Sequence, residues 1–168
     1  MTSFNLIFSF SSLKSIKSKV NLKISCLSGL KHSIEHLDLS NTSLTILPGF
    51  DLPNIVHLNM SSNKLTFVPS TALSNMSSLR LLDLSNNYLP SPPHMVWHIM
   101  PRLRSLSLAH NPIKNLVNES FLSLDRLESL DISYMDLDSV TVREAFKKKL
   151  MEFSIQGWWL FIRDNIFH

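Results

Sequence analysis

The sequence contains few of the residues on which phosphate-binding and disulfide-bonded proteins depend. Its 168 residues include only three glycines, Gly29, Gly49 and Gly157, which excludes a glycine-rich phosphate loop and a G-x-S-x-G nucleophile turn. Cys26 is the single cysteine, so the chain has no C-x-x-C motif, and we interpret Cys26 as a small buried residue. No stretch approaches the roughly 18 apolar residues of a membrane-spanning helix.

Basic and acidic residues are distributed unevenly along the chain. Residues 34–140 contain six Lys or Arg and ten Asp or Glu, a net charge of −4, whereas the two flanks contain ten basic and three acidic residues, a net charge of +7. A nucleic-acid-binding protein is expected to be basic on its organised surface. Because the organised part of this chain is acidic, we expect no nucleic-acid partner.

Leucine recurs at regular intervals over most of the chain. Residues 79–89 read L-x-x-L-x-L-x-x-N-x-L, which is the signature of a leucine-rich repeat; we number its first leucine, Leu79, as offset 0. Apolar residues at offsets 0, 3, 5 and 10 recur in copies that start at residues 34, 55, 79, 103 and 127. The copies are 21, 24, 24 and 24 residues apart. Five copies in phase predict an array of leucine-rich repeats.

The spacing inside each copy predicts its local structure. Offsets 3 and 5 alternate with polar residues, as the inward side chains of a short β-strand do. Strands of successive copies would lie side by side, about 4.8 Å apart. All eight prolines fall between residues 48 and 112, which favours irregular return segments. We predict an α/β fold: a curved leucine-rich-repeat solenoid with one short parallel strand per repeat, mostly irregular convex arcs and a C-terminal helix.

A second periodic feature is the asparagine at offset 8. Buried N–H and C=O groups need partners where the chain leaves a strand, and a carboxamide can both donate and accept. We therefore predict that Asn63, Asn87 and Asn111 form a ladder, which Thr42 and Met135 interrupt at its two ends.

The chain divides into three parts. Residues 34–140 hold the five repeats, and residues 1–33 form an N-terminal flank that is either a degenerate copy starting at residue 13, an edge strand over 20–24, or a cover for the solenoid. Residues 141–168 begin with a capping-box sequence, and helical apolar spacing predicts a capping helix over 142–153. The apolar tail over 157–162 matches no repeat offset, and we interpret it as a packed or disordered end.

Residues at offsets 2 and 4 are expected to point away from the core, onto the concave face of the sheet. Most are small and polar, so the face is either a solvated sheet or a weakly acidic surface that binds a protein partner. Its distinctive members are His36, His57, Leu81 and Tyr134. The complete set of candidate face residues is His36, Asp38, His57, Asn59, Leu81, Asp83, Ser105, Ser107, Ser129, Asp131 and Tyr134.

Two groups of histidines are candidate metal ligands. His36, His57 and Asp38 should lie within several Å of one another, but solvated polar residues on an exposed sheet explain them better. His94 and His98 are four residues apart, and the prolines before them argue against the α-helix that such a pair needs. We therefore expect no metal, no cofactor and no enzymatic activity.

The 24-residue consensus resembles the extracellular class of leucine-rich repeats. Within that class, residues 103–138 and 52–63 resemble chaoptin- and connectin-type insect cell-adhesion proteins and, more distantly, Toll-like receptor ectodomains. The resemblance implies a non-enzymatic protein-recognition role in cell adhesion, with a partner that is either a second copy or another cell-surface protein. The alternatives are a fragment of a ligand-sensing receptor ectodomain and an intracellular scaffold.

The same resemblance implies an extracellular, membrane-associated glycoprotein. Extracellular members usually have disulfide-bonded end caps and are much longer, so we interpret this chain as a fragment of a longer array. The apolar run over residues 4–10 is a poor signal peptide, and no anchor signal is evident. Possible N-glycosylation sites are Asn41, Asn59, Asn75 and Asn118.

Overall fold

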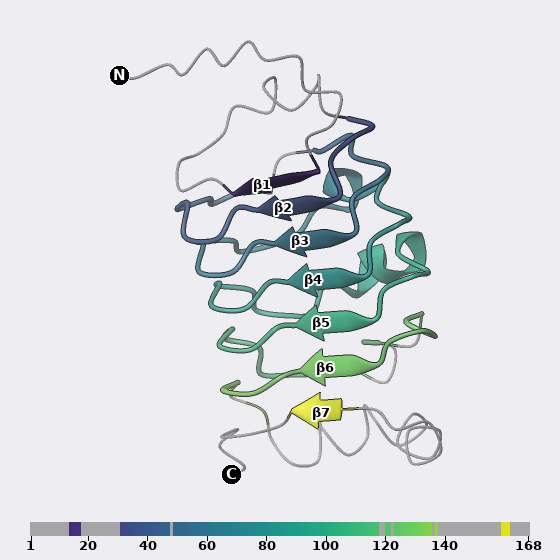
Figure 1. Cartoon of the computed structure of the whole chain (residues 1–168). Helices are drawn as coiled ribbons and strands as arrows, with labels where there is room; N and C mark the ends of the chain where they lie inside the picture. The colour runs from purple at the N-terminus through teal and green to yellow at the C-terminus, as the bar shows by residue number, and fades with distance from the viewer. Residues whose placement is uncertain are drawn as a thin grey trace.

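Seven short parallel strands form a single sheet in a computed structural model of the chain (Figure 1). The structure describes residues 14–17, 31–47, 49–117, 120–121, 123–135, 137 and 159–161. The strands lie in chain order from β1 to β7, so each repeat places its strand beside that of the preceding repeat. The strands are β1 (Ser15–Lys17), β2 (His36–Asp38), β3 (His57–Asn59), β4 (Leu81–Asp83), β5 (Ser105–Ser107), β6 (Ser129–Asp131) and β7 (Trp159–Phe161).

The register of the sheet follows the sequence period. The offset-3 leucines pair across neighbouring strands, Leu58 with Leu82 and Leu82 with Leu106. This confirms the predicted solenoid. All apolar residues at offsets 0, 3, 5 and 10 of the five copies are buried in one continuous core: Ile34, Leu37, Leu39, Leu44, Ile55, Leu58, Met60, Leu65, Leu79, Leu82, Leu84, Leu89, Leu103, Leu106, Leu108, Ile113, Leu127, Leu130, Ile132 and Leu137.

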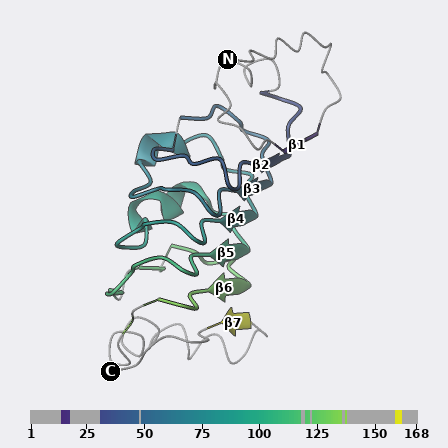
Figure 2. The same ribbon diagram turned by 90° about the vertical axis from the view of Figure 1, so that its left-hand side faces the viewer.

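The return segments lie on the side of the molecule opposite the strands (Figure 2). They are mostly irregular, with two 3-10 helices in the described residues, η3 (Ser70–Ala72) and η4 (His94–Ile99). Helix η4 buries Trp97 completely, and the indole Nε1–H donates to the carbonyl oxygen of Ser120 at 2.6 Å. The prolines before His94 therefore do not leave this arc irregular. A 3-10 helix nevertheless turns every three residues, so it does not align His94 with His98 on one face.

Two strands lie outside the five predicted repeats. β1 pairs with β2 so that Ile16 is opposite Leu37, which is the register that a copy starting at residue 13 would have. β7 pairs with β6, with Leu160 opposite Leu130. The interpretation of the apolar tail as an end without a repeat position was therefore wrong for Trp159–Phe161. The 30 residues from Ser129 to Trp159 exceed the regular period, which hid this strand from a 24-residue comparison. The segment over 20–24 and the helix over 142–153 lie outside the described residues.

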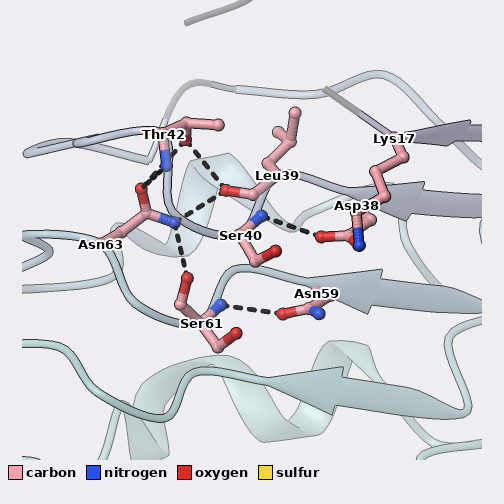
Figure 3. Close-up of polar contacts among 8 residues, drawn as sticks. All are labelled: Lys17, Asp38, Leu39, Ser40, Thr42, Asn59, Ser61 and Asn63. Atoms are coloured by element: carbon pink, nitrogen blue, oxygen red, sulfur yellow. Dashed lines mark hydrogen bonds and ion pairs between the residues drawn. The ribbon is translucent and has the colours of Figure 1, made fainter. Parts of the chain in front are cut away.

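The buried asparagines at offset 8 each connect two repeats. The Oδ1 of Asn63 accepts hydrogen bonds from the backbone N–H groups of Thr42 and Leu44, and its Nδ2 donates to the carbonyl oxygens of Leu39 and Met60 (Figure 3 shows part of this network). Asn87 and Asn111 make equivalent bonds one and two repeats further along. Thr42 is a partial substitute, because its Oγ1 donates to Leu39 O at 2.9 Å.

A left-handed backbone conformation recurs at offset 7, one residue before the position of the buried asparagines. The residue at offset 7 has a positive φ, between 53° and 56°, in all five copies. This left-handed conformation favours glycine and costs other residues roughly 1–2 kcal/mol, least for Asn. None of the five is glycine: they are Asn41, Ser62, Asn86, His110 and Tyr134. The backbone remains bonded at this turn; for example, His110 N–H donates to Ser133 O at 3.0 Å.

Candidate partner-binding face

The sheet exposes two rows of side chains on either side of a buried central row. In β2, β4, β5 and β6 the middle residue is buried and both neighbours are partly exposed; in β3 the middle residue is buried, His57 is exposed and Asn59 is partly exposed. The candidate residues at offsets 2 and 4 therefore stand on the accessible face. Paired strands bring them into register, His36 beside His57 and Leu81 beside Ser105. Together with Tyr134 we refer to them as the concave face.

The acidic and amide residues at offset 4 help to end the strands. The Oδ1 of Asp38 accepts a hydrogen bond from Ser40 N–H, and Asn59 binds Ser61 N–H in the same way, both at 2.9 Å (Figure 3). Asp83 and Asp131 repeat the arrangement with Ser85 and Ser133. These side chains hold the turn after β2, β3, β4 and β6, so their recurrence has a structural reason that does not depend on a ligand.

Asp38 is also neutralised by a neighbouring strand. Lys17 Nζ lies 2.7 Å from Asp38 Oδ2, and only about a quarter of the aspartate side chain is exposed. Partial burial raises the pKa of Asp38, but the hydrogen bonds from Lys17 and Ser40 outweigh it, so its pKa lies below the ordinary value. The concave face is consequently less acidic near β2 than its composition implies.

Two histidines form the N-terminal part of the face. The rings of His36 and His57 lie edge to face, with centroids 4.4 Å apart and an interplanar angle of 78°. Burial lowers the pKa of His57, and the positive charges of His36 and Arg80 lower it further. Within the described residues no group of three or more His, Cys, Asp or Glu is placed to hold a metal ion. The position of Asp38 against Lys17 is consistent with this.

A second ring pair lies at the other end of the face. His110 and Tyr134, both at offset 7, stack with centroids 4.1 Å apart and an interplanar angle of 8°. Tyr134 is 46% exposed, so the pair is accessible from solvent. Sequence reasoning selected Tyr134 but overlooked His110. The signal that could have found it is the equal offset, which places the two side chains on adjacent turns.

The three sequons inside the described residues differ in their surroundings. Asn41 and Asn75 are exposed, and Asn75 Nδ2 donates to Asp51 Oδ1 at 2.9 Å. Asn59 is half-buried on the concave face, where its Oδ1 holds Ser61 N–H. Asn118 lies outside the described residues. Asn41 and Asn75 are therefore the more accessible of the three.

Comparison with known proteins agrees with the repeat pattern and the geometry. Residues 49–89 match the family model described as "Leucine rich repeat", and residues 33–52 match a second model of the same description. The chain is a leucine-rich-repeat protein. This leucine-rich-repeat chain is 40% identical over 123 residues to chaoptin of Tribolium castaneum and 42% identical over 106 residues to chaoptin of Drosophila melanogaster.

The chaoptin matches cover 71% and 62% of this chain but only 16% and 8% of the relatives. The chain therefore spans less than a fifth of the length of the chaoptins it matches. Among solved structures, the Drosophila Toll–Spatzle complex in its glycosylated form superposes with a TM-score of 0.71 at 19% identity, covering 92% of this chain and 22% of that chain. At this identity the likeness shows the fold alone. No helix within the described ranges has the length and apolar character needed to cross a membrane.

Proposed function

We propose that this leucine-rich-repeat chain is a non-enzymatic protein-recognition module that acts in cell adhesion through its concave face. The observation that carries the proposal is the 40% identity to chaoptin over 123 residues. Adhesion is the role that the resemblance to chaoptin-type proteins implies. The module would form part of a longer repeat array.

The geometry of the face supports recognition by surface contact. Its strands are held by their own ladder and by the offset-4 side chains, so the face is rigid before a partner arrives. The small side chains of Ser105 and Ser107 on β5 add little height to the face, whereas the His36–His57 and His110–Tyr134 pairs place rings on it. Exposed aromatic side chains are frequent anchors in protein interfaces, because they bury a large area at low entropic cost.

A cell-aggregation assay tests adhesion directly. The 168-residue chain is fused to a signal peptide and a membrane anchor and displayed on non-adherent cells that are then mixed with unlabelled cells carrying or lacking it. Clusters containing only displaying cells would indicate contact between two copies, and clusters with cells that express another surface protein would indicate a different partner. Failure to cluster with any cell type would contradict the adhesion proposal.

Substitutions can show whether the partner binds the concave face or another part of the surface. The variant Ser105→Arg/Ser107→Arg places two long charged side chains on the concave face without entering the core, and we expect it to abolish clustering. The matched control Ser70→Arg/Ser77→Arg changes two exposed serines of one return segment and should cluster normally. Equal loss in both variants would contradict the assignment of binding to the concave face.

We also propose that the chain is extracellular and glycosylated. Expression behind a signal peptide should give a mass that falls on treatment with peptide-N-glycosidase. Asn41→Gln and Asn75→Gln should each remove one step of that shift, because both side chains are exposed. Asn59→Gln should remove none, because its carboxamide is half-buried and bonded to the turn. A secreted chain with no glycosidase-sensitive mass would count against the extracellular proposal.

A further inference from the structure

Four exposed arginines gather at the N-terminal ends of the middle strands. Arg80 and Arg104 follow the buried residues Leu79 and Leu103, and Arg102 and Arg126 precede the buried residues Leu103 and Leu127. Arg80 and Arg104 occupy the same offset in adjacent repeats, as do Arg102 and Arg126, so the members of each pair lie on neighbouring turns of the solenoid. These four residues, which we call the arginine patch, include every arginine between residues 34 and 140. The patch is basic although that part of the chain has a net negative charge.

The residues at offset 1 form a continuous hydrogen-bonded row along this edge. Arg80 N–H donates to Val56 O, Arg104 N–H to Arg80 O and Glu128 N–H to Arg104 O, with distances of 2.7 to 2.8 Å. Glu35 N–H likewise donates to Lys14 O at 2.8 Å. Side chains at offset 1 in adjacent repeats are therefore neighbours.

At both ends of this row the chain pairs a base with an acid. Lys14 Nζ lies 2.7 Å from Glu35 Oε1, and Arg104 forms an ion pair with Glu128. The hydrogen bond from Lys14 lowers the pKa of Glu35. This edge thus already binds carboxylates from neighbouring repeats, and it does so from side chains that are largely exposed.

The middle of the row has no such acid. Arg80 lies between Val56 and Arg104, and among the described residues Arg80, Arg102 and Arg126 have no ion pair or side-chain hydrogen bond. Asp83 is three residues from Arg80 and Asp125 adjoins Arg126, but neither forms an ion pair among the described residues, and Glu128 is already bound to Arg104. Three guanidinium groups are consequently available to a ligand.

We propose that the arginine patch is a second interaction surface and binds an Asp- or Glu-rich segment of a partner protein. The bound carboxylates would form ion pairs with Arg80, Arg102 and Arg126. The ion pair of Arg104 with Glu128 is the example within the chain. A guanidinium group presents a planar fork of donors that matches a carboxylate. Arg80 precedes Leu81 of the concave face, so the two surfaces adjoin, but this inference rests on the guanidinium groups and does not depend on the adhesion role proposed above.

A binding experiment with matched variants tests the proposal. Fluorescein-labelled deca-glutamate is titrated with the 168-residue chain at low ionic strength, and fluorescence anisotropy reports binding. Arg80→Gln/Arg126→Gln removes two unpaired guanidinium groups, and we expect affinity to fall about five- to tenfold, consistent with exposed charge pairs. The control Lys64→Gln/Lys114→Gln removes the same net charge from the other basic residues of 34–140 and should change affinity less than about twofold.

Two further measurements keep the result interpretable. Arg80→Lys keeps the charge but lacks the planar fork, so it should lose affinity, though less than Arg80→Gln/Arg126→Gln, and circular dichroism should be unchanged in all variants because these side chains are exposed. Equal loss of affinity in the arginine and lysine double variants would overturn the proposal, because net charge or the basic flanks would then explain binding. Arginine-dependent binding of a heparin oligosaccharide without binding of deca-glutamate would also overturn it, and would indicate a sulfated glycan instead.

Discussion

The offset-8 asparagines show how one buried side chain can hold two repeats together. Asn63, Asn87 and Asn111 are 2–6% exposed, yet each carboxamide both donates and accepts across a repeat boundary. No described buried side-chain nitrogen or oxygen lacks a partner. Unsatisfied buried backbone groups cost about 1–3 kcal/mol each, so these residues contribute more to stability than their number implies.

Removing one of these carboxamides should therefore be costly. Asn87→Ala leaves Leu65 N–H without its acceptor and removes one of the two carboxamide donors at each of the carbonyl oxygens of Met60 and Leu84. We expect a loss of about 2–4 kcal/mol in the free energy of unfolding, measured by urea denaturation. The exposed Asn115→Ala should change it by less than about 0.5 kcal/mol. Similar effects of both substitutions would contradict the bridging role.

The histidine pair gives the chain a predictable response to acid. The folded-state pKa of His57 lies below its ordinary value of 6.5, so the unfolded chain binds a proton more readily than the folded chain. The stabilising contribution is complete above pH 6.5 and is lost as the pH falls towards the folded-state pKa. Because His57 is exposed, solvent screens the effect, and we expect less than about 1 kcal/mol.

Melting temperatures measured between neutral pH and pH 5 check this expectation. The wild-type melting temperature should fall with acidification, and His57→Gln should reduce the slope. Asp38, Asp51 and Glu35, whose pKa values are lowered, act in a different window, because their contributions are lost as the pH falls below about 4.5. A wild-type curve that is flat down to pH 5 would contradict the assignment to His57.

At the scale of single elements, helix η4 anchors the return segment between β4 and β5. Trp97 fills the core at offset 18, and its Nε1–H satisfies Ser120 O in the next repeat. Trp97→Phe retains an aromatic ring but loses this bond and part of the buried volume. We expect a loss of about 2–3 kcal/mol, read from urea denaturation. Met95→Ala in the same helix removes a side chain that is 68% exposed and should cost less than about 0.5 kcal/mol.

The elements also show which features a sequence can predict. The strands β2 to β6 and their register follow from apolar residues at fixed offsets, since burial is periodic and local. β7 could not be predicted in this way, because it lies 30 residues after β6 and the prediction depends on a 24-residue period. The 3-10 helix η4 was missed because proline disfavours a helix in the residues before it, not one that begins directly after it, as η4 does at His94.

For the concave face, the sequence predicts which residues belong to it but not what they contact. Which residues lie on it follows from alternation along each strand, and the structure places all of the strand members there. What they contact does not follow from alternation. The ion pair of Asp38 with Lys17 depends on β1, whose copy has few apolar residues, and the His110–Tyr134 stack depends on a turn conformation that no glycine marks.

At the scale of the whole molecule, the array should behave as a stack of nearest-neighbour units. Each described contact between strands joins adjacent repeats, so stability should be nearly additive along the stack. Deleting residues 79–102 removes one 24-residue period and places Ser78 before Leu103, which restores the register. We expect this variant to fold with a native-like circular dichroism spectrum and a lower urea midpoint.

A deletion of half a period is the matched control. Removing residues 85–96 shifts the later part of the same repeat by twelve positions and takes Asn87 and Leu89 from the core. This variant should lose the cooperative unfolding transition. Comparable spectra and midpoints for the two deletions would contradict the nearest-neighbour description.

The left-handed residue at offset 7 gives the array a way to vary without losing its shape. The same backbone geometry presents Asn, Ser, Asn, His and Tyr on consecutive turns, so side-chain identity there is separate from the path of the chain. The conformational penalty is similar for most residue types, which makes one side chain nearly as acceptable as another. Mutation can therefore alter what each turn displays at a constant pitch, and recognition can diverge while the scaffold is inherited unchanged.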